Sequence, residues 1–168
     1  LKPFFNWIES LDKPIFLMVG VKRAINPGLK LAADGLDEFS IHDLEKLVSK
    51  YKNISFLISI LDESKEHSLR VLSRKFANIT LVGYWWFTNN KCQIRLSMKK
   101  RFEMLGTGHK IFYSDSRVTE QVIYKSKTYR SLIIENLFEM LQDVQKAGRL
   151  IIEKEIISLL TETLYIDD

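Results

Sequence analysis

An aspartate and an arginine, Asp115 and Arg117, follow the apolar run at residues 110–114 and precede a long helical pattern. Residues two apart on an extended chain share a face, so both side chains and Tyr113 point the same way if the strand continues to Arg117. A carboxylate there can ligate a metal or move a proton, and a guanidinium can bind a substrate carboxylate or an oxyanion. The alternative is structural, with Asp115 capping the next helix and pairing with Arg117.

Two adjacent tryptophans, Trp85 and Trp86, end an earlier apolar run at residues 79–87. Neighbouring residues on a strand face opposite sides, so one indole is expected under the helices and the other at the edge of a site. The alternative is that the rings simply fill the core, as large aromatic side chains usually do.

The other residues that could bind a metal form no local motif. The spacing of His42, His67 and His109 matches no known ligand pattern, and Cys92 is the only cysteine. We expect solvated or capping roles for His42 and His67, and a place for His109 in the turn before the last strand. These residues do not make a complete metal site.

The elements that must position Asp115 and the tryptophans alternate along the chain. Apolar runs predict strands at 14–21, 54–61, 79–87 and 110–114. Helical spacing predicts helices at 40–48, at 64–76 and at about 150–164, together with one helix that ends at Gly106 and one that ends at Gly148. Such alternation predicts an α/β domain with a parallel sheet. Either an open doubly wound sheet or half of a (β/α)8 barrel fits the pattern. Residues 22–39 are the longest irregular segment, in the place where α/β enzymes keep functional loops.

Composition narrows the function class. The 168 residues, 46% of them hydrophobic, fit a single domain spanning 1–168. The net charge of +4 comes from scattered residues, which argues against nucleic acid as a partner. No apolar run is long enough to span a membrane, and no secretory signal is visible. With one cysteine, the chain suits a reducing compartment, and we expect a cytoplasmic protein.

Several stretches, in order and spacing over about residues 14–147, carry a resemblance to a known family. They are residues 20–23 with Asn26 and Pro27, then residues 74–78, 83–90, 101–107, 114–118 and 121–125. Here the chain resembles uronate (glucuronate) isomerases of the metal-dependent amidohydrolase superfamily. The resemblance is most specific where a Trp-Trp-Phe run and a Ser-Asp-x-Arg run occur together.

The resemblance implies the C-terminal half of a (β/α)8 TIM barrel. It implies aldose–ketose isomerisation of a hexuronate, such as D-glucuronate to D-fructuronate, with a divalent metal, often zinc. Asp115 matches the family's metal ligand and candidate proton carrier, Arg117 its substrate-binding arginine, and Trp85 and Trp86 its aromatic rim. Two alternatives remain: a sugar-acid hydrolase or lactonase of the same superfamily, and a non-catalytic remnant or interaction fragment.

Departures from the family pattern define what this chain needs. The His-x-His pair of the family's first strand is absent, Lys91 follows Asn89 and Asn90 where proline is common, and the chain begins with Leu1. We therefore expect a segment of a larger protein whose N-terminal half-barrel supplies the remaining metal ligands. A half-barrel exposes an apolar sheet edge and apolar helix faces, so we also expect homo-oligomers.

Overall fold

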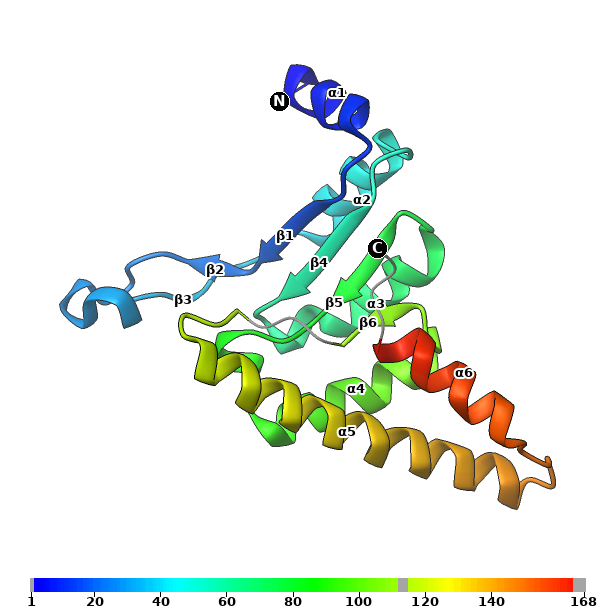
Figure 1. Cartoon of the computed structure of the whole chain (residues 1–168). Helices are drawn as coiled ribbons and strands as arrows, with labels where there is room; N and C mark the ends of the chain where they lie inside the picture. The colour runs from blue at the N-terminus through cyan, green and yellow to red at the C-terminus, as the bar shows by residue number, and fades with distance from the viewer. Residues whose placement is uncertain (1, 112–114, 165–168) are drawn as a thin grey trace.

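A parallel sheet of four strands forms the centre of the computed structural model, which describes residues 2–111 and 115–164. The strands are β1 (Ile15–Val19), β4 (Phe56–Ile60), β5 (Ile79–Val82) and β6 (His109–Lys110), and they lie side by side in that order (Figure 1). A doubly wound sheet reverses its strand order, whereas a barrel adds each new strand beside the last. The uninterrupted order therefore identifies the half-barrel rather than the doubly wound sheet.

Three helices connect the strands, namely α2 (Ile41–Lys50), α3 (Glu66–Lys75) and α4 (Lys91–Leu105). The predicted N-cap of α2 is confirmed, because Ser40 Oγ accepts a hydrogen bond from the backbone N–H of Asp43 at 3.1 Å. A short 3-10 turn, η2 (Glu63–Lys65), occupies the predicted start of α3. The local signals therefore predict the helices to within a few residues.

The two faces of the sheet differ in burial. On β4, Phe56, Ile58 and Ile60 are buried and pack with the apolar side chains of α2 and α3 in one core cluster. The opposite face is open: Phe16 and Leu57 line a groove of about 580 Å³ together with residues from β5 and β6. This second face is the one that points to the interior when a barrel is closed.

The N-terminal part contains elements that the sequence pattern does not predict. Helix α1 (Lys2–Leu11) precedes the sheet and buries Phe5, whose ring stacks on Tyr51 at 4.4 Å between centroids. The segment expected to be irregular forms an arm that projects from the sheet (Figure 1), with β2 (Val21–Lys22) antiparallel to β3 (Gly35–Leu36) and a 3-10 turn, η1 (Pro27–Ala32), between them.

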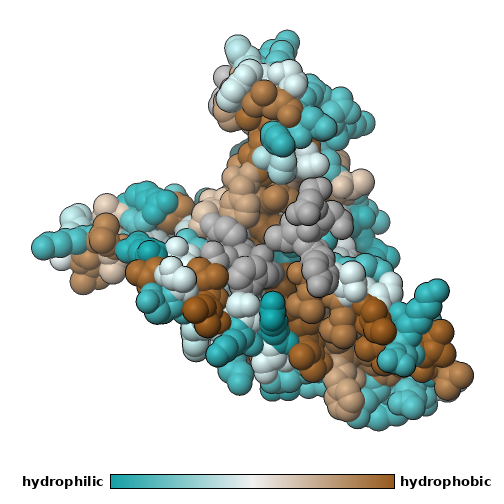
Figure 2. Space-filling model, viewed as in Figure 1, coloured by the Kyte–Doolittle hydropathy of each residue, from teal (hydrophilic) through white to brown (hydrophobic). Residues whose placement is uncertain are grey.

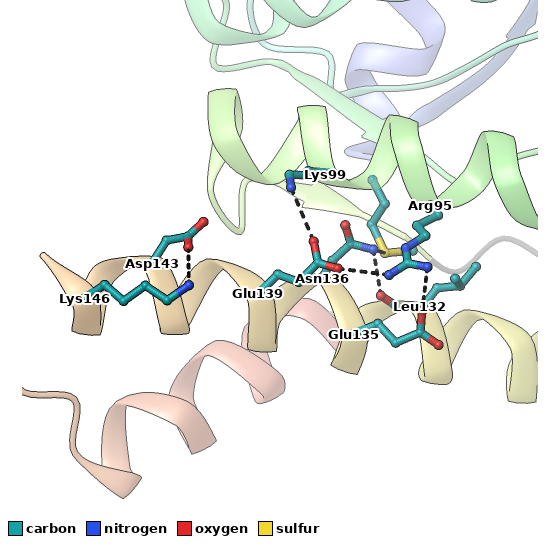
Figure 3. Close-up of polar contacts among 9 residues, drawn as sticks. Arg95, Lys99, Leu132, Glu135, Asn136, Glu139, Asp143 and Lys146 are labelled. Atoms are coloured by element: carbon teal, nitrogen blue, oxygen red, sulfur yellow. Dashed lines mark hydrogen bonds and ion pairs between the residues drawn. The ribbon is translucent and has the colours of Figure 1, made fainter.

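Two helices follow the sheet, α5 (Thr119–Lys146) and α6 (Glu153–Leu164). Figure 3 shows exposed ion pairs between α4 and α5. The Glu139 carboxylate lies 2.9 Å from Nη2 of Arg95 and 3.3 Å from Nζ of Lys99. Beneath them a second core cluster contains Met98 of α4 and Leu132, Ile133 and Leu137 of α5. Helix α5 is thus held on α4 by apolar packing with charged contacts at the surface.

Apolar side chains are also exposed, as expected for a half-barrel. Figure 2 shows apolar surface over α5 and α6, where Phe138 is 59% and Ile157 56% exposed. Burying such surface is the main favourable contribution of packing, so these faces are suited to further contacts. Within the described ranges, no helix combines the length and the apolar character needed to cross a bilayer.

Candidate functional site at the carboxyl edge of β5 and β6

Two segments that carry the predicted site residues follow neighbouring strands. Strands β5 and β6 are parallel, with Leu81 opposite His109 and Val82 opposite Lys110. The backbone N–H of Gly83 then donates to the carbonyl of Lys110 at 2.9 Å, which continues the pairing beyond β5. The carboxyl ends of parallel strands meet at one edge of a sheet, where α/β enzymes place their sites. The Trp85–Trp86 pair and Asp115 therefore follow strands that end at the same edge.

The segment after β5 leaves the sheet earlier than the sequence predicts. Strand β5 ends at Val82, and Gly83 (φ 47°) and Trp86 (φ 46°) both have left-handed backbone conformations. A 3-10 turn, η3 (Trp86–Thr88), follows, and the Thr88 hydroxyl bonds the backbone carbonyl of Trp85 at 2.8 Å. The predicted strand at 79–87 is thus wrong beyond Val82, because these turns redirect the chain. We call residues 83–89 the aromatic loop.

The aromatic loop stacks its rings instead of dividing them between two faces. The centroids of Trp85 and Trp86 lie 6.2 Å apart with planes 20° apart, and those of Trp86 and Phe87 lie 5.4 Å apart at 8°. Trp85 is buried, Trp86 is half-buried and Phe87 is 49% exposed. The two indoles therefore do not face opposite sides as expected, although one of them, Trp85, is buried and Trp86 is more accessible, and Phe87 joins the predicted pair. The unbroken Trp-Trp-Phe run was the feature of the sequence that could have indicated a role for Phe87.

A buried ionic cluster lies beneath the aromatic loop. Arg101 of α4 donates from Nε to Glu66 Oε1 at 2.8 Å and from Nη1 to the carbonyl of Gly83 at 3.2 Å. Its guanidinium carbon lies 4.4 Å from the ring centroid of Tyr84, close enough for a cation–π contact. Ser97 donates to the same Glu66 oxygen, and Arg70 Nη1 lies 3.6 Å from it. Arg101 thus ties the aromatic loop to α3 and α4.

Burial and charge oppose each other in this cluster. Burial alone raises the pKa of Glu66, but the charge of Arg101 and the hydrogen bond from Ser97 outweigh it and leave that pKa below its usual value. Burial raises the pKa of the Tyr84 phenol, so it is neutral. Glu66 and Arg101 therefore form a charged pair in the protein interior. Sequence reasoning missed this pair, because its members lie on different helices.

The Asp115 segment departs from the predicted strand. Residues 112–114 lie outside the described part of the chain, so the predicted strand at 110–114 and the orientation of Tyr113 are untested there. Asp115 has φ 35°, which is left-handed, so the strand does not continue to Arg117 and the condition for Asp115 and Arg117 to share one face is not met. Both side chains are exposed, and no described ion pair joins them. Val118, not Asp115, is the N-cap of α5, so the structural alternative also fails.

One face of α5 contacts both segments. Gln121 Oε1 accepts from the backbone N–H of Arg117 at 3.0 Å, and Lys125 Nζ donates to the carbonyl of Asp115 at 3.0 Å. The Tyr129 hydroxyl lies 3.2 Å from the carbonyl oxygen of Tyr84 and 2.9 Å from Oδ1 of Asn89. We call Gln121, Lys125 and Tyr129 the α5 stripe. The sequence pattern marked residues 121–125 as a motif without showing this role.

The candidate metal ligands are scattered. His42 and His67 are exposed, as predicted, whereas His109 lies in β6 and not in the turn before it. Its ring is buried and packs edge-to-face with the ring of Phe102, at 4.9 Å between centroids. Burial, followed by the positive charge of Arg101, lowers the pKa of His109 to about 3, so the ring is neutral. Among the described residues, no three His, Cys, Asp or Glu side chains group closely enough to hold a metal.

Fold and site together define an α/β half-barrel with polar and aromatic groups at its carboxyl edge. The chain is similar to a uronate isomerase from Bacillus halodurans, with 36% identity and a TM-score of 0.91 over 96% of this chain. A uronate isomerase from Thermotoga maritima is 18% identical with a TM-score of 0.84, again over 96% of this chain, and supports the fold. The resemblance to uronate isomerases predicted from the motifs is thereby confirmed.

The chain spans only part of these proteins, 38% of the Bacillus protein and 37% of the Thermotoga protein. No family model matches the sequence. No curated protein matches it either. The similarity therefore concerns this segment and not the full length of either protein.

Proposed function

We propose that this chain forms part of the active site of a uronate isomerase, an enzyme that interconverts an aldose hexuronate and its ketose, such as D-glucuronate and D-fructuronate. The observation that carries the proposal is the similarity to the Bacillus halodurans uronate isomerase over 96% of this chain. The positions of the site residues agree with it, because the aromatic loop and the Asp115 segment follow adjacent parallel strands.

Each group has a role that its chemistry suits. The exposed Asp115 carboxylate moves the proton between C2 and C1 of the sugar, as a general base and then a general acid. The exposed Arg117 guanidinium pairs with the substrate carboxylate in a fork geometry. Trp86 and Phe87 present stacked faces to the apolar side of the sugar, and the buried Trp85 supports them.

A divalent metal fits this chain only in part. The exposed Asp115 carboxylate is a suitable oxygen ligand, but the described residues supply no group of three ligands, so the others must come from the rest of the barrel. When bound, a divalent metal such as zinc would supply Lewis-acid chemistry toward the substrate carbonyl. The contribution of this chain is therefore a single ligand together with the groups that bind and orient the sugar.

The remaining half-barrel is the partner that the proposal requires. The open face of the sheet, with Phe16 37% exposed, would become the barrel interior on closure. We expect residues 1–168 alone to have little isomerase activity. An active, metal-dependent isomerase made only of these residues would contradict that expectation.

The test is to read the coding DNA upstream of the Leu1 codon, in frame, and to assay the product of the whole reading frame, which we call the full-length product. We expect a further half-barrel whose first strand ends in His-x-His, and metal-dependent interconversion of D-glucuronate and D-fructuronate. A stop codon or an unrelated domain upstream would contradict the proposal and favour a non-catalytic fragment.

A substrate panel separates the isomerase from its nearest alternative. Hexuronates and their lactones are given to the full-length product with zinc or another divalent metal. Ketose formation without lactone opening supports the isomerase. Lactone opening without ketose formation would assign the site to a hydrolase instead.

A further inference from the structure

The three side chains of the α5 stripe are spaced so that they can hold the Asp115 segment and the aromatic loop in place. Its members are four residues apart, so Gln121, Lys125 and Tyr129 lie on one face of the helix. That face reaches both segments of the site: the first two residues bond the backbone on either side of Ser116, and Tyr129 reaches the aromatic loop. One rigid helix thus contacts the two segments that carry the proposed site residues.

The backbone at Asp115 needs such support. Its φ of 35° lies in the left-handed region, which aspartate adopts more often than most residues other than glycine but still seldom. Conformations of this kind persist where the surrounding structure holds them. Lys125 binds the carbonyl of Asp115 and Gln121 binds the N–H of Arg117, so this turn is held from both sides.

We propose that the α5 stripe positions Asp115 and Arg117 relative to the aromatic loop, and that Gln121, Lys125 and Tyr129 are positioning residues of the site. They act through the backbone of the residues that meet the substrate. The expected effect on kcat rests on the proposed function, whereas the expected effect on amide hydrogen exchange at Arg117 does not.

Burial at Lys125 is consistent with this role. The side chain is half-buried, and its ammonium group donates to the backbone carbonyl of Asp115 at 3.0 Å. Lys127, two residues further along α5, is exposed and lies on a different face. The two lysines therefore offer a matched pair that separates positioning from a general effect of charge on the helix.

The first experiment follows the backbone directly, by amide hydrogen exchange of the full-length product. Gln121→Met removes the acceptor of the Arg117 N–H, and we expect that amide to exchange about 5- to 10-fold faster, the factor that one hydrogen bond represents. Gln121→Glu keeps an acceptor oxygen and should exchange within about twofold of the unmodified protein. Unchanged exchange at Arg117 in Gln121→Met would overturn the inference whatever the enzyme catalyses.

The exposed Gln145, near the C-terminal end of α5, provides the control for helix stability. Gln145→Met should leave exchange at Arg117 unchanged. Equal acceleration by Gln145→Met and Gln121→Met would mean that the helix as a whole had loosened, and would contradict specific positioning.

The second experiment measures kinetics of the full-length product on D-glucuronate. Lys125→Met should lower kcat roughly 10- to 100-fold with KM within about threefold, because small displacements of a reacting group cost rate more than binding. Lys125→Arg can still donate to the Asp115 carbonyl and should recover most of kcat. Lys127→Met should match the unmodified enzyme.

The outcomes distinguish two kinds of failure. Equal kcat in Lys125→Met and Lys127→Met, in an enzyme that is active, would overturn the positioning role and leave the proposed function standing. A complete barrel without isomerase activity would overturn the proposed function, and exchange at Arg117 would then decide positioning alone.

Discussion

The aromatic loop and the Asp115 segment lie at the same edge of the sheet, yet they are held in opposite ways. The aromatic loop rests on the buried Arg101, which bonds Gly83 and Glu66 beneath it. The Asp115 segment is exposed and is held by side chains of α5 that reach its backbone. The first depends on the protein interior, and the second on a helix surface beside solvent.

This difference shows how neighbouring segments of one site can be fixed by different physical means. A buried ionic cluster is rigid, because breaking it leaves an uncompensated charge in a low-dielectric interior. Hydrogen bonds at the surface compete with water and contribute less. The backbone of the aromatic loop is therefore expected to resist disruption more strongly than that of the Asp115 segment, whose hydrogen bonds lie at the surface.

The largest expected effect is on catalysis and not on stability. Asp115→Asn in the full-length product should lower kcat by roughly 10²- to 10⁴-fold, the usual contribution of a general acid–base group. Because the Asp115 side chain is exposed, the free energy of unfolding should change by less than about 0.5 kcal/mol. Steady-state kinetics and urea unfolding measure the two quantities.

Asp143→Asn, on the exposed surface of α5, is the matched control and should retain full activity. A loss of activity in Asp115→Asn no larger than in Asp143→Asn would remove Asp115 from the proposed reaction.

At the buried ionic cluster we expect a large effect on stability. Arg101→Met leaves the Glu66 carboxylate buried without its main partner, which should cost about 3–5 kcal/mol of unfolding free energy. Urea unfolding of the full-length product checks the loss, and near-UV circular dichroism checks whether the stacked rings of the aromatic loop are disturbed.

Arg95→Met removes an arginine from the exposed surface of the same helix and should cost less than about 1 kcal/mol. If Arg101→Met were as stable as Arg95→Met, the cluster would not be what holds the aromatic loop.

A pH dependence should follow from His109. Its pKa is lowered to about 3 in the folded protein from an ordinary value of 6.5, so the unfolded chain binds more protons between these values. Stability is therefore full above pH 6.5 and falls as the pH drops toward 3. Between pH 7 and pH 5 the expected loss is about 2 kcal/mol, measured by urea unfolding at each pH.

His109→Gln should flatten this dependence between pH 7 and pH 5, whereas His67→Gln, at an exposed position, should keep it. The pKa of Glu66 is also lowered, so its contribution is lost in the same direction at more acidic pH. A slope that survived in His109→Gln would assign the effect to another group.

The smallest expected effect concerns the turn of the aromatic loop. Thr88→Val keeps the side-chain shape but removes the hydroxyl that bonds the Trp85 carbonyl, and should cost about 1 kcal/mol of unfolding free energy. Thr119→Val, at the exposed start of α5, should cost less. Equal values for the two variants would show that the hydroxyl of Thr88 does not hold the turn.

Local signals in the sequence were sufficient for the order of the elements and for their approximate limits. Apolar runs gave the positions of β1, β4 and β5, and Ser40 and Gly106 marked helix ends that the structure confirms. These signals act between residues within one or two turns of each other, so they are readable in a linear pattern. The motifs around Trp85 and Asp115 also indicated the family.

Tertiary structure decided what lies between those elements. The pairing of Glu66 with Arg101 joins residues 35 positions apart, and the left-handed backbone at Trp86 and Asp115 interrupts segments whose pattern predicted extended chain. A helix pattern shows which face is polar, but not which distant group that face will meet. The sequence by itself therefore determined which residues could form the site. The tertiary structure determined their orientation, because contacts between segments, such as Arg101 with Gly83 and Lys125 with Asp115, set the backbone where local preferences are weak.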